Sequence, residues 1–189
     1  MENKKRCSWC GKDELYVKYH DEEWGKITRD DATMFEFLIL ESFQAGLSWI
    51  TILRKRENFR QAFDGFNYHK IAKYGEEKIA ELLQNKGIIR NQLKIRAAIN
   101  NAQKFMELQQ EFGSFYDYVM TFTNGKTFVN RWESEAEIPA TTELSDKISK
   151  DLKKRGFKFL GSTVMYSHLQ ATGIIDDHIN ACFAKRETK

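Results

Sequence analysis

The chain has 189 residues, a formal net charge of +3 at pH 7 and 13% aromatic residues. This length is enough for a sizeable core, and we expect one domain over residues 1–189, built from two closely packed helical lobes. A single proline and 11 glycines favour helices over a loop-rich sandwich or barrel. The weak positive charge permits a nucleic-acid partner but excludes a histone-like basic tail.

Cysteine usage and the start of the chain indicate a cellular compartment. Three cysteines cannot all pair within one disulfide framework, and free thiols are typical of a reducing cytosol. The first ten residues lack the apolar segment of a secretory signal, and no apolar run approaches the length of a membrane span. We therefore expect a cytoplasmic protein with no membrane partner, and nothing indicates more than a monomer.

Apolar residues at helical spacing predict an all-α protein. The predicted helices cover residues 31–43, 48–58, 91–111, 145–154 and 162–172. An Asp is expected to cap the first of these helices, and Ser145 the helix at 145–154. The polar segment 120–142 contains Pro139 and predicts an irregular connection, in which a short hairpin around 124–131 is possible.

Thiols and imidazoles lie at both ends of the chain. Cys7 and His20 are near the start, and His178 and Cys182 are near the end. Two sulfur and two nitrogen ligands are what a closed tetrahedral zinc site uses, and a helix would place His178 and Cys182 on one face. Spacing alone leaves open the alternative of buried free cysteines and unrelated histidines. Cys10 offers a competing thiol.

Glu41 falls on an apolar helix face, together with Met34, Phe37 and Leu38. A buried carboxylate is costly unless it is paired or used, and burial raises its pKa into a range that suits acid–base work or ligand recognition. The alternative is a carboxylate that caps a neighbouring helix or pairs with an arginine. The pattern alone favours this alternative.

Aromatic residues cluster in the first 50 positions. They are Trp9, Tyr16, Tyr19, Trp24 and Trp49. Such side chains can stack on a flat base and, if the base is cationic, attract it through their π faces. The alternative is ordinary core packing and shielding of a metal site.

Basic residues recur at 54–56, 90–96 and 153–158, each of which on its own is typical of a solvated helix face. The third cluster leads into two glycines five residues apart, which predict a hairpin near 153–165 between two helices. Free backbone N–H groups and small hydroxyls at the start of the second helix would bind a phosphate without reading sequence.

Several of these stretches resemble one known family. The matching motifs are residues 19–25 (YHDEEWG), 40–50 (LESFQAGLSWI), 87–91 (GIIRN), 153–161 (KKRGFKFLG) and 177–178 (DH). They occur in the order found in the 3-methyladenine DNA glycosylase I family, and the resemblance spans roughly residues 6–183. It implies a helix-hairpin-helix DNA repair fold, in which Cys7, His20, His178 and Cys182 bind one structural zinc ion that joins the terminal segments.

The resemblance also implies a reaction, which is hydrolysis of the N-glycosidic bond of 3-methyladenine in alkylated double-stranded DNA without strand cleavage. Glu41 would recognise the base. Trp49 and Tyr16 would stack on it or hold it, with Trp9, Tyr19 and Trp24 as walls or support. The turn of Gln44, Ala45, Gly46 and Leu47 would fill the gap left by the flipped nucleotide. The phosphate contacts would come from Gly156, Lys158, Gly161, Ser162 and Thr163, with Arg90 and Lys94 as further candidates.

Asp176 falls where many helix-hairpin-helix glycosylases carry a catalytic aspartate. The 3-methyladenine type is generally described as independent of that residue, and N-capping of a helix at His178 is the favoured role. A contribution to steadying positive charge on the sugar is a further hypothesis.

Two other classes of function fit parts of the sequence. A zinc-stabilised module that binds damaged DNA without catalysis would explain the basic clusters and the hairpin, but would leave Glu41 without a role. A small-molecule enzyme such as a nucleoside hydrolase would leave the hairpin unexplained.

Overall fold

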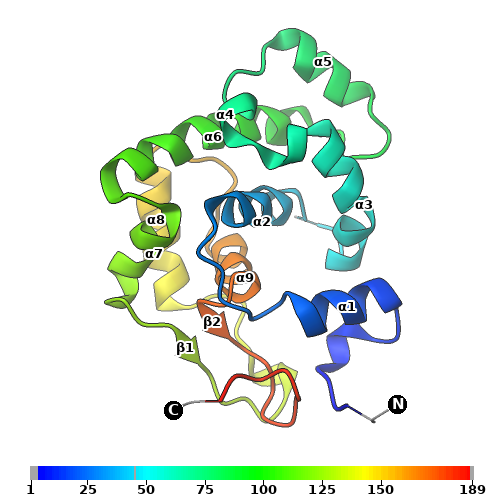
Figure 1. The fold of residues 1–189 in the computed structure, drawn as a ribbon, viewed down its shortest axis with the longest axis vertical. Coiled ribbons are helices and arrows are strands. Elements are labelled where there is room, and N and C mark those ends of the chain that lie inside the picture. Colours follow the sequence, from blue (N-terminus) through cyan, green and yellow to red (C-terminus); the bar gives the residue numbers. More distant parts are fainter. Residues whose placement is uncertain (1–3, 45, 188–189) are drawn as a thin grey trace.

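The computed structural model describes residues 4–44 and 46–187 and is mostly helical (Figure 1). The α-helices are α1 (Glu14–Glu22), α2 (Asp31–Gln44), α3 (Trp49–Ala62), α4 (Tyr68–Ile71), α5 (Glu76–Gln84), α6 (Gln92–Phe112), α7 (Phe115–Thr123), α8 (Glu143–Lys154) and α9 (Ser162–Ala171). Three short 3₁₀ helices are η1 (Ser8–Cys10), η2 (Asp64–Phe66) and η3 (Glu135–Glu137). No helix within the described ranges is long and apolar enough to cross a bilayer.

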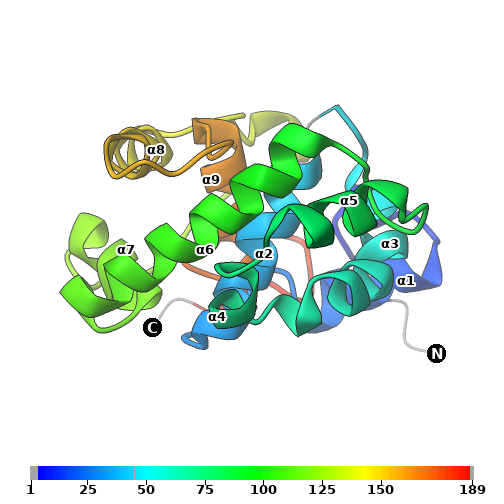
Figure 2. The same ribbon diagram turned by 90° about the horizontal axis from the view of Figure 1, so that it is seen from above.

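Helix α2 forms the centre of the molecule. Its residues from Met34 to Leu40 are apolar almost without interruption, and a helix that is apolar on most sides must be covered on most sides. It packs against α3, α6, α7 and α9. Asp30 caps it, because its carboxylate accepts the Thr33 backbone N–H at 2.8 Å. Figure 2 shows α6 crossing over α2, with α8 and α9 on one side and α1 and α3 on the other.

The five predicted helices are present, and the structure corrects one cap. Thr142, not Ser145, is the N-cap of α8. Ser145 lies at the third helical position and completes a capping box, since its hydroxyl accepts the Thr142 backbone N–H at 2.9 Å. Helices α1, α4, α5 and α7 were not predicted. Each has nine residues or fewer, and helices this short owe their stability to packing more than to their own pattern.

The suggested hairpin around 124–131 is wrong. Strand β1 (Phe128–Val129) instead pairs in parallel with β2 (Ile175–Asp176), in the register Phe128 to Ile175. The backbone N–H of Phe128 donates to the Ile174 carbonyl at 2.8 Å. The segment that follows α7 therefore lies beside the segment that follows α9.

Both terminal segments lie at the lower end of the molecule in Figure 1. They are joined directly, because the Phe183 backbone N–H donates to the Lys5 carbonyl at 2.9 Å. One hydrophobic cluster runs through the described residues and includes Cys7 at one end of the chain and Cys182 at the other.

Candidate functional site

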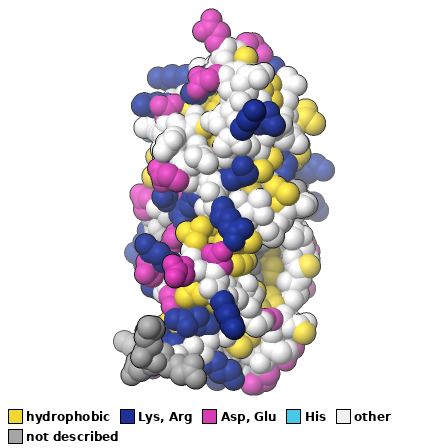
Figure 3. Space-filling view, turned by 90° about the vertical axis from the view of Figure 1, so that its right-hand side faces the viewer, with side chains coloured by type: hydrophobic (Ala, Val, Ile, Leu, Met, Phe, Trp, Pro, Cys, Tyr) yellow, Lys and Arg dark blue, Asp and Glu magenta, His cyan; other side chains and the backbone are white. Residues whose placement is uncertain are grey.

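A pocket of about 340 Å³ opens between the N-terminal segment, α1, α2, α3 and α9. Its lining residues are Trp9, Tyr16, Tyr19, Trp24, Glu41, Gln44, Trp49, Glu135, Ile138, Ser167 and Gln170. Figure 3 shows that this side of the molecule is hollowed, with hydrophobic side chains inside the hollow. Lys and Arg side chains are dispersed over the same face rather than gathered in one patch.

Glu41 lies in this pocket and is only 5% exposed. Among the described residues it has no hydrogen-bonding or ion-pairing partner. Burial raises its pKa to about 8, so the carboxyl is largely protonated at neutral pH. The pattern-based expectation of a cap or an arginine pair is wrong. Arg56, the buried arginine of α3, is held by Glu23 and Glu36 instead.

The five aromatic residues predicted to form a base-binding wall all line the pocket. The Trp9 ring lies 5.0 Å from the rings of both Tyr16 and Trp24, and Tyr19 lies 5.6 Å from Trp49. They therefore support one another while presenting faces and edges to the cavity. The Trp49 Nε1 is buried and has no hydrogen-bond partner among the described residues.

Four lining residues were not found from the sequence. Ser167 and Gln170 lie on α9, and Glu135 and Ile138 come from the segment expected to be irregular. Nothing in the hydrophobic pattern separates them from surface residues, because their role depends on which elements the fold places around the cavity. Gln44, predicted to contact DNA, also lines the pocket.

The thiols and imidazoles from the two ends of the chain come together. Ligand atoms of Cys7, His20 and Cys182 lie within 4.8 Å of one another, and all three residues are buried. Interaction with the Cys7 thiol lowers the pKa of Cys182, and the same interaction together with burial raises the pKa of Cys7. Cys10 is not part of this group, and its thiol donates to the Cys7 carbonyl at 3.1 Å.

His178 borders this group without belonging to it, with its ring 5.0 Å from that of His20. Each of these imidazoles donates its Nδ1–H to a carboxylate, His20 to Asp21 at 2.8 Å and His178 to Asp176 at 2.7 Å. This leaves the Nε2 atom of each ring for another partner. The His178 Nε2 is buried and, within the described part of the chain, has none.

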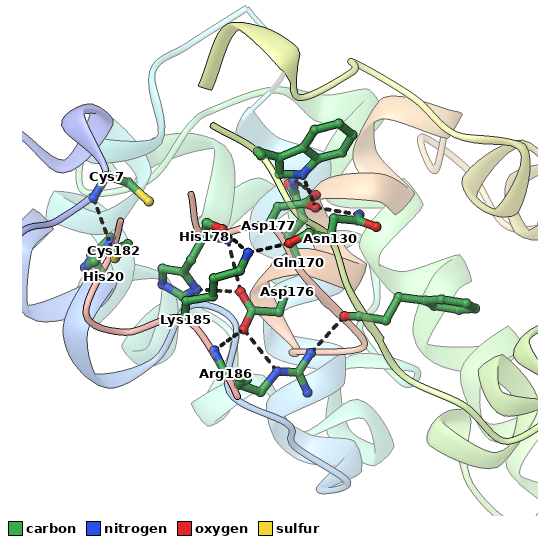
Figure 4. Close-up of polar contacts among 12 residues, drawn as sticks. Cys7, His20, Asn130, Gln170, Asp176, Asp177, His178, Cys182, Lys185 and Arg186 are labelled. Atoms are coloured by element: carbon green, nitrogen blue, oxygen red, sulfur yellow. Dashed lines mark hydrogen bonds and ion pairs between the residues drawn. The ribbon is translucent and has the colours of Figure 1, made fainter. Parts of the chain in front are cut away.

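Asp176 is fully buried, and Figure 4 shows it between His178 and Arg186. Burial alone would raise its pKa, but hydrogen bonds from His178 and Arg186 outweigh burial and lower it to about 2. It does not line the pocket. The expectation that it caps a helix at His178 is wrong, since residues 177–182 form no helix. It does accept the His178 backbone N–H at 3.0 Å.

Comparison with known proteins identifies the family. The model for methyladenine glycosylases matches residues 9–185. The chain belongs to the methyladenine glycosylase family. It is 46% identical over 177 residues to DNA-3-methyladenine glycosylase 1 of Escherichia coli (strain K12), covering 94% of this chain and 95% of that protein.

Solved structures of 3-methyladenine DNA glycosylase I share the fold. One crystal structure matches with a TM-score of 0.93 at 47% identity, covering 96% of this chain and 100% of that chain. The Staphylococcus aureus enzyme, described for its recognition of 3-methyladenine, matches with a TM-score of 0.93 at 35% identity, covering 97% and 98%.

In this member of the methyladenine glycosylase family, the turn between α8 and α9 is held from α6. The buried Asn101 side chain accepts the Lys158 backbone N–H at 2.8 Å and donates to the Lys158 carbonyl at 2.9 Å. Gly156 adopts a φ of +93°, which favours glycine. The predicted phosphate contacts Lys158, Gly161 and Thr163 are exposed, whereas Gly156 and Ser162 are half-buried.

Among the other predicted DNA contacts, some side chains are exposed and one is buried. Arg90 is exposed, and Leu47 is 40% exposed beside Gly46, whose φ is +82°. Ala45 of the same turn lies outside the described residues. Lys94 is buried, contrary to the prediction, and its ammonium donates to the Phe43 carbonyl at 3.1 Å. It therefore caps the C-terminal end of α2 rather than facing a phosphate.

Proposed function

We propose that the protein hydrolyses the N-glycosidic bond of 3-methyladenine in alkylated double-stranded DNA, releasing the free base and leaving an abasic site. The observation that carries the proposal is the pocket of a methyladenine glycosylase family member, in which aromatic rings surround a Glu41 carboxyl that has no partner among the described residues. Its volume of about 340 Å³ suits a single flipped base. The protein acts as a cytoplasmic monomer.

Glu41 recognises the base rather than protonating it. Methylation at N3 gives the base a positive charge, so it is already a good leaving group. A cation beside Glu41 lowers the pKa of that carboxyl from about 8, and the resulting carboxylate can accept a hydrogen bond from the base. Aromatic faces from Tyr16 and Trp49 add cation–π attraction. These contacts stabilise the base as the bond to the sugar breaks.

The helix-hairpin-helix of α8, its turn and α9 grips the DNA backbone near the lesion. Support comes from the N-terminus of α9, where the first backbone N–H groups of a helix have no partner within the helix. Ser162 and Thr163 add hydroxyls there, and Lys158 adds a charge. Gln44, Gly46 and Leu47 fill the gap left by the flipped nucleotide, and Arg90 binds a phosphate.

One structural zinc ion is held by Cys7, His20, His178 and Cys182. The clustered thiols, the partnerless buried Nε2 of His178 and the carboxylates at both Nδ1 atoms fit such a site, because zinc-binding histidines commonly donate their other N–H to a carboxylate. Four protein ligands leave no position for a reacting water, so the ion supplies stability rather than catalysis. Asp176 orients His178 and takes no part in bond cleavage.

The deciding experiment is incubation of the purified protein with methylated duplex DNA, followed by separation of the released bases. Free 3-methyladenine from the wild type, with little from Glu41→Gln, supports both the reaction and the role of Glu41. No release by a folded, DNA-binding wild type would instead indicate a module that binds damaged DNA without cutting the glycosidic bond.

A further inference from the structure

Glu135 is a pocket residue that no sequence motif contains. It lies in η3, which belongs to the segment between α7 and α8, and it lines the same cavity as Glu41. Its two carboxylate oxygens accept hydrogen bonds from Ser8, one from the backbone N–H and one from the side-chain hydroxyl. Both oxygens of this carboxylate are therefore engaged by one residue of the N-terminal segment.

Ser8 fixes this carboxylate in relation to the pocket wall. Ser8 lies between Cys7, a residue of the thiol–imidazole group, and Trp9, a pocket aromatic. Because a doubly hydrogen-bonded carboxylate has little freedom to turn away, its charge stays at the pocket edge. The Glu135 side chain therefore does not have to lose conformational freedom when a ligand enters the pocket.

The charged groups that line the pocket show why the position of the Glu135 carboxylate matters. Among the described lining residues, Glu41 and Glu135 are the two acidic groups, and none is Lys, Arg or His. Burial raises the pKa of Glu41 to about 8, which leaves it mostly neutral before a ligand arrives. The standing negative charge at the cavity therefore comes from Glu135.

We propose that Glu135 is a specificity-determining residue that favours cationic over neutral purines in the pocket. The inference rests on the proposed function in one respect, which is that the natural cation is an N3-alkylated base. A fixed negative charge at the edge of a cavity with apolar walls attracts a cation and does little for a neutral base of the same shape. Glu135 thus adds a standing charge to the discrimination between alkylated and normal adenine, alongside the contributions of Glu41 and the aromatic rings.

The test uses two small probes of matched shape, so it does not depend on catalysis. The 3,9-dimethyladeninium ion carries a fixed positive charge, and 3,9-dimethyl-3-deazaadenine is its neutral carbon isostere at a pH above the pKa of its ring nitrogen, where both probes are measured. Binding of each is followed by quenching of the pocket tryptophans in the wild type, Glu135→Gln and Glu137→Gln. Glu137 is the matched control, because it lies on the same turn and is exposed but does not line the pocket.

The measured quantity is the ratio of the Kd of the neutral probe to the Kd of the cation. Glu135→Gln should lower this ratio by about three- to tenfold through weaker binding of the cation, with neutral binding nearly unchanged. Glu137→Gln should keep the wild-type ratio. Equal ratios in the wild type and Glu135→Gln, or equal loss of both probes, would overturn the inference.

Failure of the proposed function has a different signature. A wild type that releases no base from methylated DNA, yet binds the cation preferentially through Glu135, would refute the glycosylase reaction and leave the charge selectivity standing. Release of base by the wild type, with the same probe ratio in Glu135→Gln, would refute the inference alone.

Discussion

At the scale of single residues, Glu41 shows what a sequence can and cannot specify. Helical spacing with Phe37 and Leu38 placed it on a buried face, and the structure confirms this with 5% exposure. The pattern could not show whether an arginine reaches it. That depends on side chains from other parts of the chain, because Glu36 of α2 and Glu23, at the end of α1, hold Arg56 of α3 instead. The aromatic neighbours were likewise visible as a cluster, but their enclosure of one cavity was not.

Replacement of Glu41 by Gln should reduce base excision far more than it reduces folding. The variant keeps the shape but loses the ability to become a carboxylate beside a cationic base. Loss of one hydrogen bond to a charged group costs about 1.5–3 kcal/mol, so single-turnover excision should fall about 10- to 100-fold. Quenched-flow release of 3-methyladenine measures this, and an unchanged rate would remove Glu41 from the site.

The same residue should make stability depend on pH. The pKa of Glu41 is about 8 in the folded protein against an ordinary value of 4.5, so between these values the folded state binds the extra proton. The contribution of Glu41 to the free energy of unfolding therefore falls as pH rises through this range, by up to about 1.4 kcal/mol per pH unit. It levels off above the folded pKa. Its titratable neighbours Tyr16 and Tyr19 have raised pKa values and stay neutral throughout.

The variant Glu41→Gln has no carboxyl to titrate at this position. Comparison of the variant with the wild type therefore separates the contribution of Glu41 from those of the other titrating groups. The free energy of unfolding of the variant, relative to the wild type, should increase from about pH 5 to about pH 8. Urea denaturation of both proteins at several pH values gives this difference. A difference that does not vary with pH would show that Glu41 is ionised in the folded protein.

At the scale of elements, sequence periodicity located the long helices but not their neighbours in space. The prediction of α6 and α8 to within two residues at each end follows from clear apolar stripes. Strands β1 and β2 are two residues each, and their pairing joins segments far apart in the sequence. Such a pairing leaves no local signal. The turn at 155–161 was predicted from its glycines, whereas its attachment to Asn101 required the structure.

Asn101 should be the residue on which this turn depends. Asn101→Ala removes both hydrogen bonds to Lys158 and leaves the backbone N–H and C=O of Lys158 without that partner, at a cost of at most about 1–3 kcal/mol each. We expect a lower midpoint of thermal unfolding and weaker binding to undamaged duplex DNA. Gln103→Ala is the matched control, since Gln103 lies exposed on the same helix and donates to the Ala72 carbonyl, away from this turn. Equal effects of the two variants would contradict this assignment.

At the scale of the whole molecule, the two ends of the chain meet beside the pocket. Cys7 and Cys182 are brought into one group with His20, while Trp9 follows Cys7 by two residues and forms part of the pocket wall. The sequence identified the potential ligands, but spacing could not prove that half-sites separated by more than a hundred residues would meet. The parallel pairing of β1 with β2 and the contact of Phe183 with Lys5 hold the C-terminal segment in place.

Removal of the proposed zinc ion should therefore weaken both the fold and the pocket. A ligand that binds only the folded state, at a hundredfold excess over its Kd, stabilises it by about 2.7 kcal/mol. We expect one zinc ion per chain by elemental analysis and a loss of at least about this stability after chelation, with slower base release as Trp9 loses its anchor.

Two cysteine variants separate this role from that of an ordinary buried thiol. Cys182→Ser should lose zinc and reproduce the chelated protein. Cys10→Ser should keep one zinc ion, because the Cys10 thiol faces the Cys7 carbonyl, to which a serine hydroxyl can also donate. Full zinc content in Cys182→Ser would remove Cys182 from the ligand set. An unchanged unfolding midpoint after chelation would show that the terminal segments hold together through packing and hydrogen bonds alone.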